Sequence, residues 1–176
     1  MAPAGHGSVG TGVRSADVVD GVLRLTLNNT LDAIDDGRLE ILAFLTPADL
    51  TDRIINRLEV VFEELVANAV RHSFGRGAPH TLTVAVSLAP DRIAMVFEDD
   101  GAPFDPLAVA EPEPFGSPET VRLGGLGLPL IRRLSSEVRY ERLRGVGGDK
   151  RFEPRNRVSV AIALEAPPQA RPGLTV

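Results

Sequence analysis

Apolar residues recur at three- and four-residue spacings between residues 54 and 69, which is the strongest pattern in the sequence. This spacing places the apolar side chains on one side of an α-helix, so we expect a helix that packs against the core. Either Asp49 or Thr51 can cap its start, because each side chain can accept a hydrogen bond from a free backbone N–H group. We expect this helix to extend to about His72.

The rest of the chain contains further helix-like and strand-like segments. One helix is expected to follow a cap at Asn29 or Thr30 and to end near Leu45, and another to follow the glycines at 124–127 and reach Leu134. Alternating or β-branched apolar residues predict strands over 18–27, 80–88, 92–98, 138–143 and 157–164. The strands over 80–88 and 92–98 should pair antiparallel with each other, and so should those over 138–143 and 157–164. We therefore expect an α+β fold, a two-layer α/β sandwich with a mostly antiparallel sheet and helices on one face.

The two ends and one internal segment differ in composition from the rest. Residues 1–16 are rich in Gly, Ala and Ser without periodicity, and residues 166–176 are rich in proline, so we expect both to be disordered tails. A single domain is then expected over 17–165. Residues 102–123 are also rich in proline, and a loop of this length is usually a lid, a binding loop or disordered.

Composition excludes several classes of protein. With 176 residues, 43% of them hydrophobic, the chain is long enough for one domain with a sizeable core. It has no cysteine and three scattered histidines, which excludes disulfides and thiolate metal sites and argues against a zinc centre. No apolar run approaches the roughly 20 residues that cross a bilayer, and the first residues lack the pattern of a signal peptide. We therefore expect a cytosolic protein without membrane contact.

Charge narrows the choice further. The net charge of −5 argues against direct nucleic-acid binding, which needs clustered positive charge. The only basic cluster, over 132–144, is expected to be a solvated surface or a protein contact. Lys150 is the only lysine and lies in no G-x-x-x-x-G-K-[ST] motif, so a P-loop is excluded and any nucleotide must be held in another way.

Three polar residues lie one turn apart along the edge of the apolar stripe: Glu64, Asn68 and His72. The amide oxygen of Asn68 can be a ligand to Mg²⁺, together with phosphate oxygens and water. Glu64 can accept the proton of a water or hydroxyl that attacks a γ-phosphate. The alternative is that all three are boundary residues with solvated polar ends, with Glu64 paired to Arg57 or Arg71.

Two glycine-containing motifs follow. Asp99 comes directly after the strand expected at 92–98, where a fixed carboxylate can accept a hydrogen bond from the exocyclic amine of adenine. Gly101 lets the backbone turn tightly beside a ring, although an ordinary Asp-Gly turn explains these two residues as well. The glycines at 124–127 precede a helix, whose free N–H groups and dipole favour phosphate, and a flexible hinge is the alternative there.

Taken in order, Glu64-x-x-x-Asn68, Asp99-x-Gly101 and the glycines at 124–127 resemble the N, G1 and G2 boxes of the GHKL ATPase superfamily, which includes gyrase, histidine kinases and MutL. The segments ELVANAVRHS, DDGAPFDP and GGLGLPLIRRL are similar, more narrowly, to the bacterial anti-sigma-factor serine kinases of the RsbW and SpoIIAB type. This resemblance implies a Bergerat ATP-binding fold, ATP with Mg²⁺, and phosphorylation of a serine or threonine on a STAS-domain anti-anti-sigma factor. It also implies sequestration of a sigma factor, commonly by a homodimer.

The resemblance assigns a role to each matching residue. Glu64 would be the general base, Asn68 the Mg²⁺ ligand and Asp99 the adenine anchor. The other residues would contact the nucleotide, with Gly101 near the adenine, the glycines at the phosphates and His72 in a supporting role. These residues are His72, Gly101, Pro103, Phe104, Gly124, Gly125, Leu126, Gly127 and Leu128.

The sequence also departs from the family pattern. Pro129 follows the glycine box where a residue with a backbone amide is expected, and the connector at 145–156 is long. The predicted lid carries several glutamates with only Arg122 nearby, and negative charge beside a triphosphate is unfavourable. These features bear on catalysis more than on nucleotide binding. Two alternatives therefore stay open: a non-catalytic, ATP-dependent protein-binding regulator with the same fold, and an interaction domain that binds no nucleotide.

Overall fold

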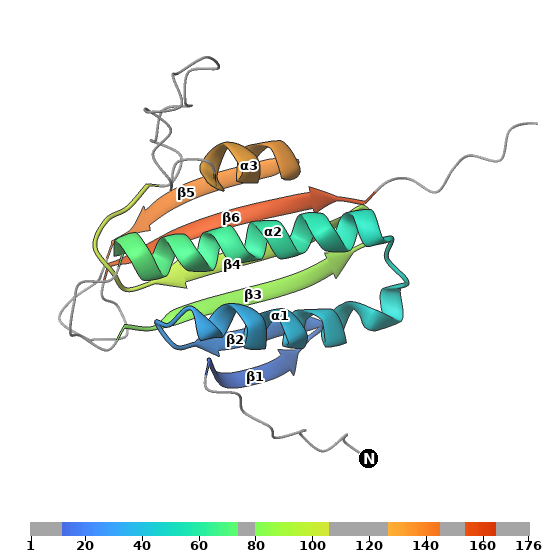
Figure 1. The fold of residues 1–176 in the computed structure, drawn as a ribbon, viewed down its shortest axis with the longest axis horizontal. Coiled ribbons are helices and arrows are strands. Elements are labelled where there is room, and N and C mark those ends of the chain that lie inside the picture. Colours follow the sequence, from blue (N-terminus) through green and yellow to red (C-terminus); the bar gives the residue numbers. More distant parts are fainter. Residues whose placement is uncertain (1–11, 74–79, 106–126, 145–153, 165–176) are drawn as a thin grey trace, which may run out of the picture.

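The computed structural model describes residues 12–73, 80–105, 127–144 and 154–164. Six strands in this part of the chain form one antiparallel sheet with the order β1-β2-β3-β4-β6-β5 (Figure 1). The strands are β1 (Val13–Val19), β2 (Val22–Leu27), β3 (Leu82–Ala89), β4 (Arg92–Asp99), β5 (Glu137–Leu143) and β6 (Arg155–Ala163). The helices are α1 (Asp32–Leu45), α2 (Asp52–Asn68) and α3 (Gly127–Leu134), with a 3₁₀ turn at Thr46–Ala48 and a π-helical turn at Ala69–Ser73.

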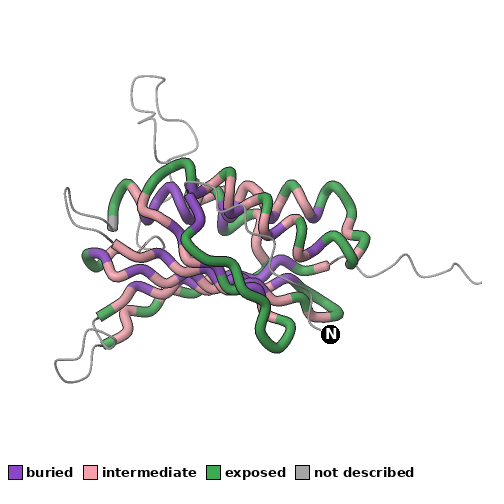
Figure 2. The backbone as a smooth tube through the Cα atoms, turned by 90° about the horizontal axis from the view of Figure 1, so that it is seen from below, coloured by how far each residue is buried: buried purple, intermediate pink, exposed green. Residues whose placement is uncertain are grey.

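All three helices cover the same face of the sheet, so the molecule has two layers (Figures 1 and 2). The core lies between the layers, where α2 buries Leu58, Val61 and Phe62 completely. Phe62 lies against Phe97 of β4, with their ring centroids 6.1 Å apart. The expected α+β sandwich is confirmed, and so are the hairpin of β3 with β4 and the pairing of β5 with β6. No helix within the described ranges is long and apolar enough to cross a membrane.

The first hairpin corrects two expectations. The strand expected over 18–27 is divided by a tight turn, in which Asp20 and Gly21 have φ values of 51° and 74°. Positive φ at both positions matches the two-residue turns that suit the twist of a hairpin. The preceding strand β1 begins at Val13, inside the segment expected to be a tail. The expected C-terminal tail, most of the expected lid and most of the 145–156 connector lie outside the described residues.

The helix starts also differ from the expectation. Leu31, not Asn29 or Thr30, is the N-cap of α1, and it makes no side-chain capping bond. Thr51 is the N-cap of α2, as one of the two alternatives proposed, but only its backbone carbonyl contributes, accepting hydrogen bonds from Ile54 and Ile55 at 2.9 and 3.1 Å. Packing of the apolar stripe therefore holds these helices in place without side-chain caps.

Gly12 joins the first strand to the helical layer. Its N–H donates to Asp36 Oδ2 at 2.7 Å, and its carbonyl accepts from the Asn28 N–H at 2.9 Å. A Cβ atom at this position would lie 2.4 Å from the Cα of Ala33. Only glycine fits so close to the start of α1.

We therefore expect Gly12→Ala to destabilise the fold by about 1–3 kcal/mol, because the neighbouring backbone cannot yield as a side chain can. Urea denaturation measures the change in the free energy of unfolding. Ser15→Ala, an exposed position on β1, is the control and should change it by less than about 0.5 kcal/mol. Equal stability of the Gly12 variant and the wild type would show that β1 does not pack on α1 in this way.

Candidate functional site

A small cavity of about 20 Å³ lies where the C-terminal end of α2 approaches the ends of β3, β4 and β6. It brings together two of the residues predicted to bind nucleotide, Asn68 from α2 and Asp99 from β4, and a third, Phe104, from the segment after β4. Apolar side chains form the rest of its wall. The lining residues are Leu65, Asn68, Ala69, Leu82, Phe97, Asp99, Phe104 and Val158.

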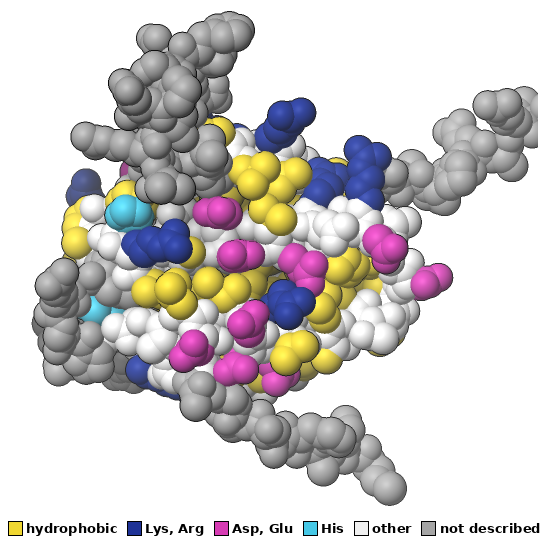
Figure 3. Space-filling view, in the orientation of Figure 1, with side chains coloured by type: hydrophobic (Ala, Val, Ile, Leu, Met, Phe, Trp, Pro, Cys, Tyr) yellow, Lys and Arg dark blue, Asp and Glu magenta, His cyan; other side chains and the backbone are white. Residues whose placement is uncertain are grey.

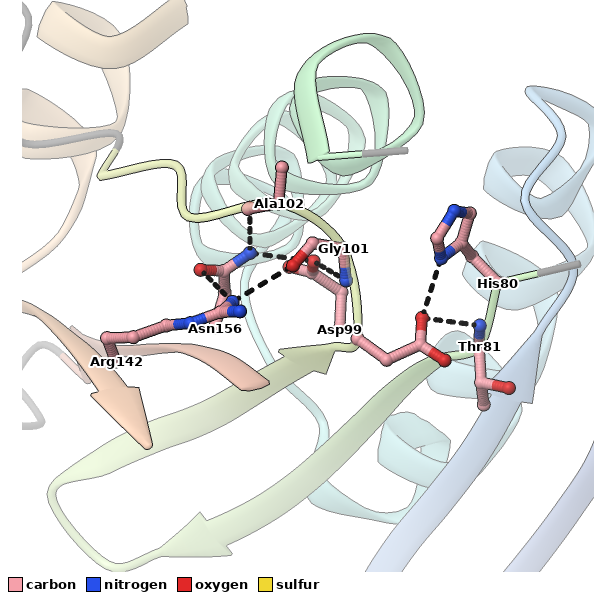
Figure 4. A network of polar contacts seen from close by, with 8 residues as sticks. His80, Thr81, Asp99, Gly101, Ala102, Arg142 and Asn156 are labelled. Atoms are coloured by element: carbon pink, nitrogen blue, oxygen red, sulfur yellow. Dashed lines mark hydrogen bonds and ion pairs between the residues drawn. The ribbon is translucent and has the colours of Figure 1, made fainter. Parts of the chain in front are cut away.

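Asp99 is a buried carboxylate, with 8% of its surface exposed. In the sheet it lies between Leu82 of β3 and Asn156 of β6. Its Oδ1 accepts hydrogen bonds from the Gly101 N–H at 3.0 Å and from Asn156 Nδ2 at 2.8 Å (Figure 4). Donors on both sides compensate the charge that burial removes from water. The pair Asp99 and Gly101 therefore forms a fixed turn at the cavity, a structure that fits both the predicted binding motif and the alternative of an ordinary Asp-Gly turn.

Asp100, the next residue, fixes the same loop to β3. Its Oδ1 accepts hydrogen bonds from the Thr81 N–H at 3.1 Å and from His80 Nδ1 at 3.0 Å. Figure 4 shows these bonds on the side of the loop that faces away from Asn156. The two consecutive aspartates thus hold the loop from opposite sides.

Asn156 is a central residue of the site that the sequence analysis missed, because it was assigned to the connector before the last strand. It is 1% exposed, and its Nδ2 donates to Asp99 and also to the Ala102 carbonyl, both at 2.8 Å. Along β6, Asn156 shares the inward face with Val158, Val160 and Ile162. An asparagine in line with an apolar row was the signal that could have identified it.

Two side chains of β5 complete the contacts of Asn156. The Tyr140 hydroxyl and Arg142 Nη1 both donate to its Oδ1 at 2.9 Å. Arg142 Nη1 also donates to the Gly101 carbonyl at 3.0 Å, and the Phe104 N–H approaches the same Asn156 oxygen at 3.4 Å. The loop after β4 is thus joined to β5 and β6 through one amide.

Asn68 contributes to the cavity a polar group that no described residue satisfies. It is 8% exposed, and its Nδ2 is buried without a hydrogen-bond partner in the part of the chain that the structure describes. Directly after it, α2 changes into the π-helical turn Ala69–Ser73, a feature that often marks functional positions. A buried polar atom left unpaired costs roughly 1–3 kcal/mol. Because Nδ2 is a donor, its place on the cavity wall fits an acceptor such as a phosphate oxygen, whereas Mg²⁺ would have to be held by the amide oxygen of the same side chain.

Glu64 lies one turn before Asn68 on α2 and is half-buried, but it is not part of the cavity wall. The suggested pairing with Arg57 is not observed. Arg57 instead donates to the Leu134 carbonyl at the end of α3, at 3.0 and 2.7 Å. The role of Glu64 as a general base therefore stays a prediction.

The remaining predicted residues fall into three groups. The exposed His72 ring stacks on Phe104, with centroids 4.9 Å apart and an interplanar angle of 18°. Pro103, directly before Phe104 in the chain, is also exposed. The second group lies at the start of α3, where Gly127 is the first residue and Leu128 the second. The residues that lie outside the described part of the chain are Gly124, Gly125 and Leu126.

A larger groove of about 650 Å³ lies elsewhere, between α2 and α3. Its lining includes three arginines, Arg53, Arg57 and Arg133. Figure 3 shows basic side chains gathered over α3 and the neighbouring end of α2, whereas acidic ones are spread over the rest of this face. The groove contains none of the predicted nucleotide-binding residues, so we place the candidate site at the smaller cavity.

The sequence also matches a known family. A sequence profile of the histidine kinase-like ATPase domain matches residues 27–151. The chain belongs to the histidine kinase-like ATPase domain family. The matched range contains α2, Asp99, Asp100 and the glycines at 124–127, and the expected membership of the GHKL superfamily is confirmed.

Individual relatives of this histidine kinase-like ATPase domain are named kinases. The serine-protein kinase RsbW of Listeria innocua is 29% identical over 112 residues, which cover 58% of this chain and 68% of that protein. The serine/threonine-protein kinase BtrW of Bordetella bronchiseptica is 27% identical over 110 residues, covering 60% of this chain and 78% of that protein. The chain is therefore similar in sequence to a group of bacterial protein kinases.

A solved structure supports the fold. The crystal structure of the RsbU and RsbW domains of a Mycobacterium tuberculosis protein matches with a TM-score of 0.54 and 20% sequence identity. The match covers 83% of this chain but only 33% of the other, so this ATPase domain spans about a third of that chain. The likeness concerns the α+β architecture alone.

Tyr140 gives a spectroscopic probe of the site, because it is the only tyrosine of the chain. Burial raises the pKa of its hydroxyl above the ordinary value of 10.0, and the nearby carboxylates of Asp105 and Asp99 act in the same direction, against the opposing effect of Arg142. The folded chain should then keep this proton at a pH where the unfolded chain has lost it. Stability from this group is complete below pH 10.0 and is lost as the pH rises through the raised pKa.

Titration of the ultraviolet tyrosinate band measures this pKa directly. We expect a midpoint above 10.0 in the folded protein and the ordinary value in urea. Circular dichroism at each pH confirms that the chain is still folded. Identical midpoints in the two states would contradict the partly buried position of Tyr140 beside Asn156.

Proposed function

We propose that this chain is a cytosolic, ATP-dependent protein kinase that phosphorylates a serine or threonine of a STAS-domain anti-anti-sigma factor and sequesters a sigma factor. The main observation in support is that Asn68 and Asp99, from separate elements, line one cavity. The family and the kinase names of the relatives support phosphoryl transfer from ATP. The partner classes, and a possible homodimer, rest on the resemblance of the three motifs to the anti-sigma serine kinases.

Asp99 is the proposed adenine anchor. Its carboxylate can accept a hydrogen bond from the exocyclic amine of adenine, whereas guanine presents a carbonyl oxygen at that position and would be repelled. The cavity of about 20 Å³ has room for about one water molecule. A purine can therefore enter only if part of the cavity wall moves. We expect Phe104 to move, because it is half-buried and its ring stacks on the exposed His72.

The proposed transfer needs a metal ion and a base. Mg²⁺, when bound, neutralises charge on the phosphate oxygens, and Asn68 is the residue that would hold it. The hydroxyl oxygen of the partner attacks the γ-phosphorus, Glu64 accepts the hydroxyl proton, and the bond to the leaving ADP breaks. Glu64, one turn before Asn68 on the same helix, is the nearest carboxylate along α2 on this side of the stripe.

A second candidate function has its own observation. Glu64 is not part of the cavity wall, so a nucleotide anchored at Asp99 would not need its carboxylate. The chain would then be a regulator that binds a partner in an ATP-dependent manner without phosphoryl transfer. The two experiments that follow separate ATP binding from chemistry.

Asp99→Asn should abolish the response to ATP, because the amide would present a donor as well as an acceptor to the adenine amine. For the wild type, ATP with Mg²⁺ at 100 times its Kd should add about 2.7 kcal/mol of stability, seen as a rise in Tm. Asp17→Asn, on the exposed part of β1, is the matched control. A wild type whose Tm does not change with millimolar ATP would remove the ATP-binding proposal.

Glu64→Gln should reduce phosphoryl transfer by about 10²- to 10⁴-fold, because the variant side chain cannot accept the proton. ATP affinity should be nearly unchanged. Transfer is measured with labelled ATP and a candidate STAS-domain protein. Glu63→Gln, the exposed neighbour on α2, should transfer phosphate at the rate of the wild type. Nucleotide binding without labelling of any candidate partner would favour the non-catalytic regulator.

A further inference from the structure

Asn156 stands between two opposite charges. Its Nδ2 donates to the Asp99 carboxylate at 2.8 Å, and its Oδ1 accepts from Arg142 Nη1 at 2.9 Å. Figure 4 shows the three side chains in this order, with the amide in the middle. Arg142 is also close to the loop of Asp99, because the same Nη1 donates to the Gly101 carbonyl at 3.0 Å.

The neutral amide of Asn156 lies in an otherwise apolar row of side chains. The residues that follow it on the inward face of β6 are Val158, Val160 and Ile162. A buried amide is unfavourable unless its donors and acceptor are all used. Here Nδ2 donates to Asp99 and Ala102, and Oδ1 accepts from groups of β5. The donors and the acceptor of the Asn156 amide are thus all hydrogen-bonded. The amide can therefore interact with charged neighbours, which an apolar residue at this position could not do.

That role follows from what the two charges would do without it. An arginine and a carboxylate that meet directly form a strong, often bidentate pair, and the attraction is greatest away from water. A carboxylate engaged in this way turns toward its partner and presents less of its charge to a ligand. Asn156 instead supplies Asp99 with a neutral donor and occupies Arg142 with a neutral acceptor.

We propose that Asn156 is a positioning residue for nucleotide selection, which keeps Asp99 directed at the cavity by separating it from Arg142. The proposal rests on the proposed function, in which Asp99 reads the adenine amine. It goes beyond that function because it makes the choice between adenine and guanine depend on a residue of β6 and on one of β5. It predicts that the loss of ATP affinity on removal of the Asn156 side chain is caused in part by Arg142.

A double-variant cycle on the full chain tests this dependence. Calorimetry gives the Kd of ATP and GTP for the wild type, Asn156→Ala, Arg142→Ala and the double variant. Asn156→Ala should weaken ATP binding by about 10- to 100-fold, the loss typical of a hydrogen bond to a buried charge. GTP binding should change little, so the preference for ATP falls. Adding Arg142→Ala should restore a large part of the ATP affinity.

A matched control separates this effect from a general change in charge. Arg139 lies on the same strand but is exposed and forms an ion pair with Glu137. Adding Arg139→Ala to Asn156→Ala should restore nothing. If the double variant with Arg142→Ala binds ATP no better than Asn156→Ala alone, or if Asn156→Ala weakens ATP and GTP equally, the proposal is wrong.

Stability without nucleotide gives an independent test. If Asn156 were only a structural bridge, Arg142→Ala would cost less in the Asn156→Ala background, because the shared partner is already gone. If Asn156 separates the charges, Arg142→Ala should cost more in that background, because it removes a new ion pair with Asp99. Urea denaturation of the four proteins gives the sign of this coupling, and the first outcome would overturn the proposal.

The two tests also separate this proposal from the proposed function. If the wild type binds no ATP, the proposed function fails, and the sign of the stability coupling still decides whether Asn156 keeps the two charges apart. If ATP binds and the coupling has the sign of a structural bridge, the proposed function stands and the role of Asn156 falls.

Discussion

A carboxylate buried at the end of a strand must be surrounded by donors, because its charge has lost the hydration of water. Asp99 meets this requirement through the Gly101 N–H and Asn156 Nδ2. The same amide also accepts hydrogen bonds from two side chains of β5 and donates to the Ala102 carbonyl. The compensation of one charge thus fixes the path of the chain after β4 and joins it to two further strands.

The other side of the cavity depends on the packing of α2. Leu58, Val61 and Phe62 are fully buried, so the helix cannot rotate without exposing them. Asn68 is consequently held at the cavity although its buried Nδ2 has no partner among the described residues. The cost of an unpaired amide is small beside the burial of three large apolar side chains, each about 1.5–3 kcal/mol. The packing of the core therefore holds the unpaired Nδ2 of Asn68 at the cavity, where a ligand could accept its hydrogen bond.

Local sequence patterns were sufficient to predict much of the fold and part of the candidate site. The stripe of α2 and the β3–β4 hairpin follow from periodicity, and the Asp99-Gly101 motif was recognisable because a carboxylate follows a buried strand. Asn156 was missed because the last strand was expected to begin at 157; the apolar row of β6 could have shown that Asn156 is buried, but not that it bonds to a residue 57 positions away. β1 was missed because nearly all its residues are exposed, so it shows no alternation.

The proposed binding groups and the proposed base differ in how the fold holds them. Asp99 and Asn156 are buried and bonded to each other, so a change at either disturbs the sheet as well as the site. Glu64 is half-buried and lies outside the cavity wall, and the sheet does not depend on it. Under the proposed function, substitutions near Glu64 would alter phosphoryl transfer while the fold and the cavity persist. Nucleotide binding would then be the property tied to folding, and phosphoryl transfer the property that could be gained or lost separately.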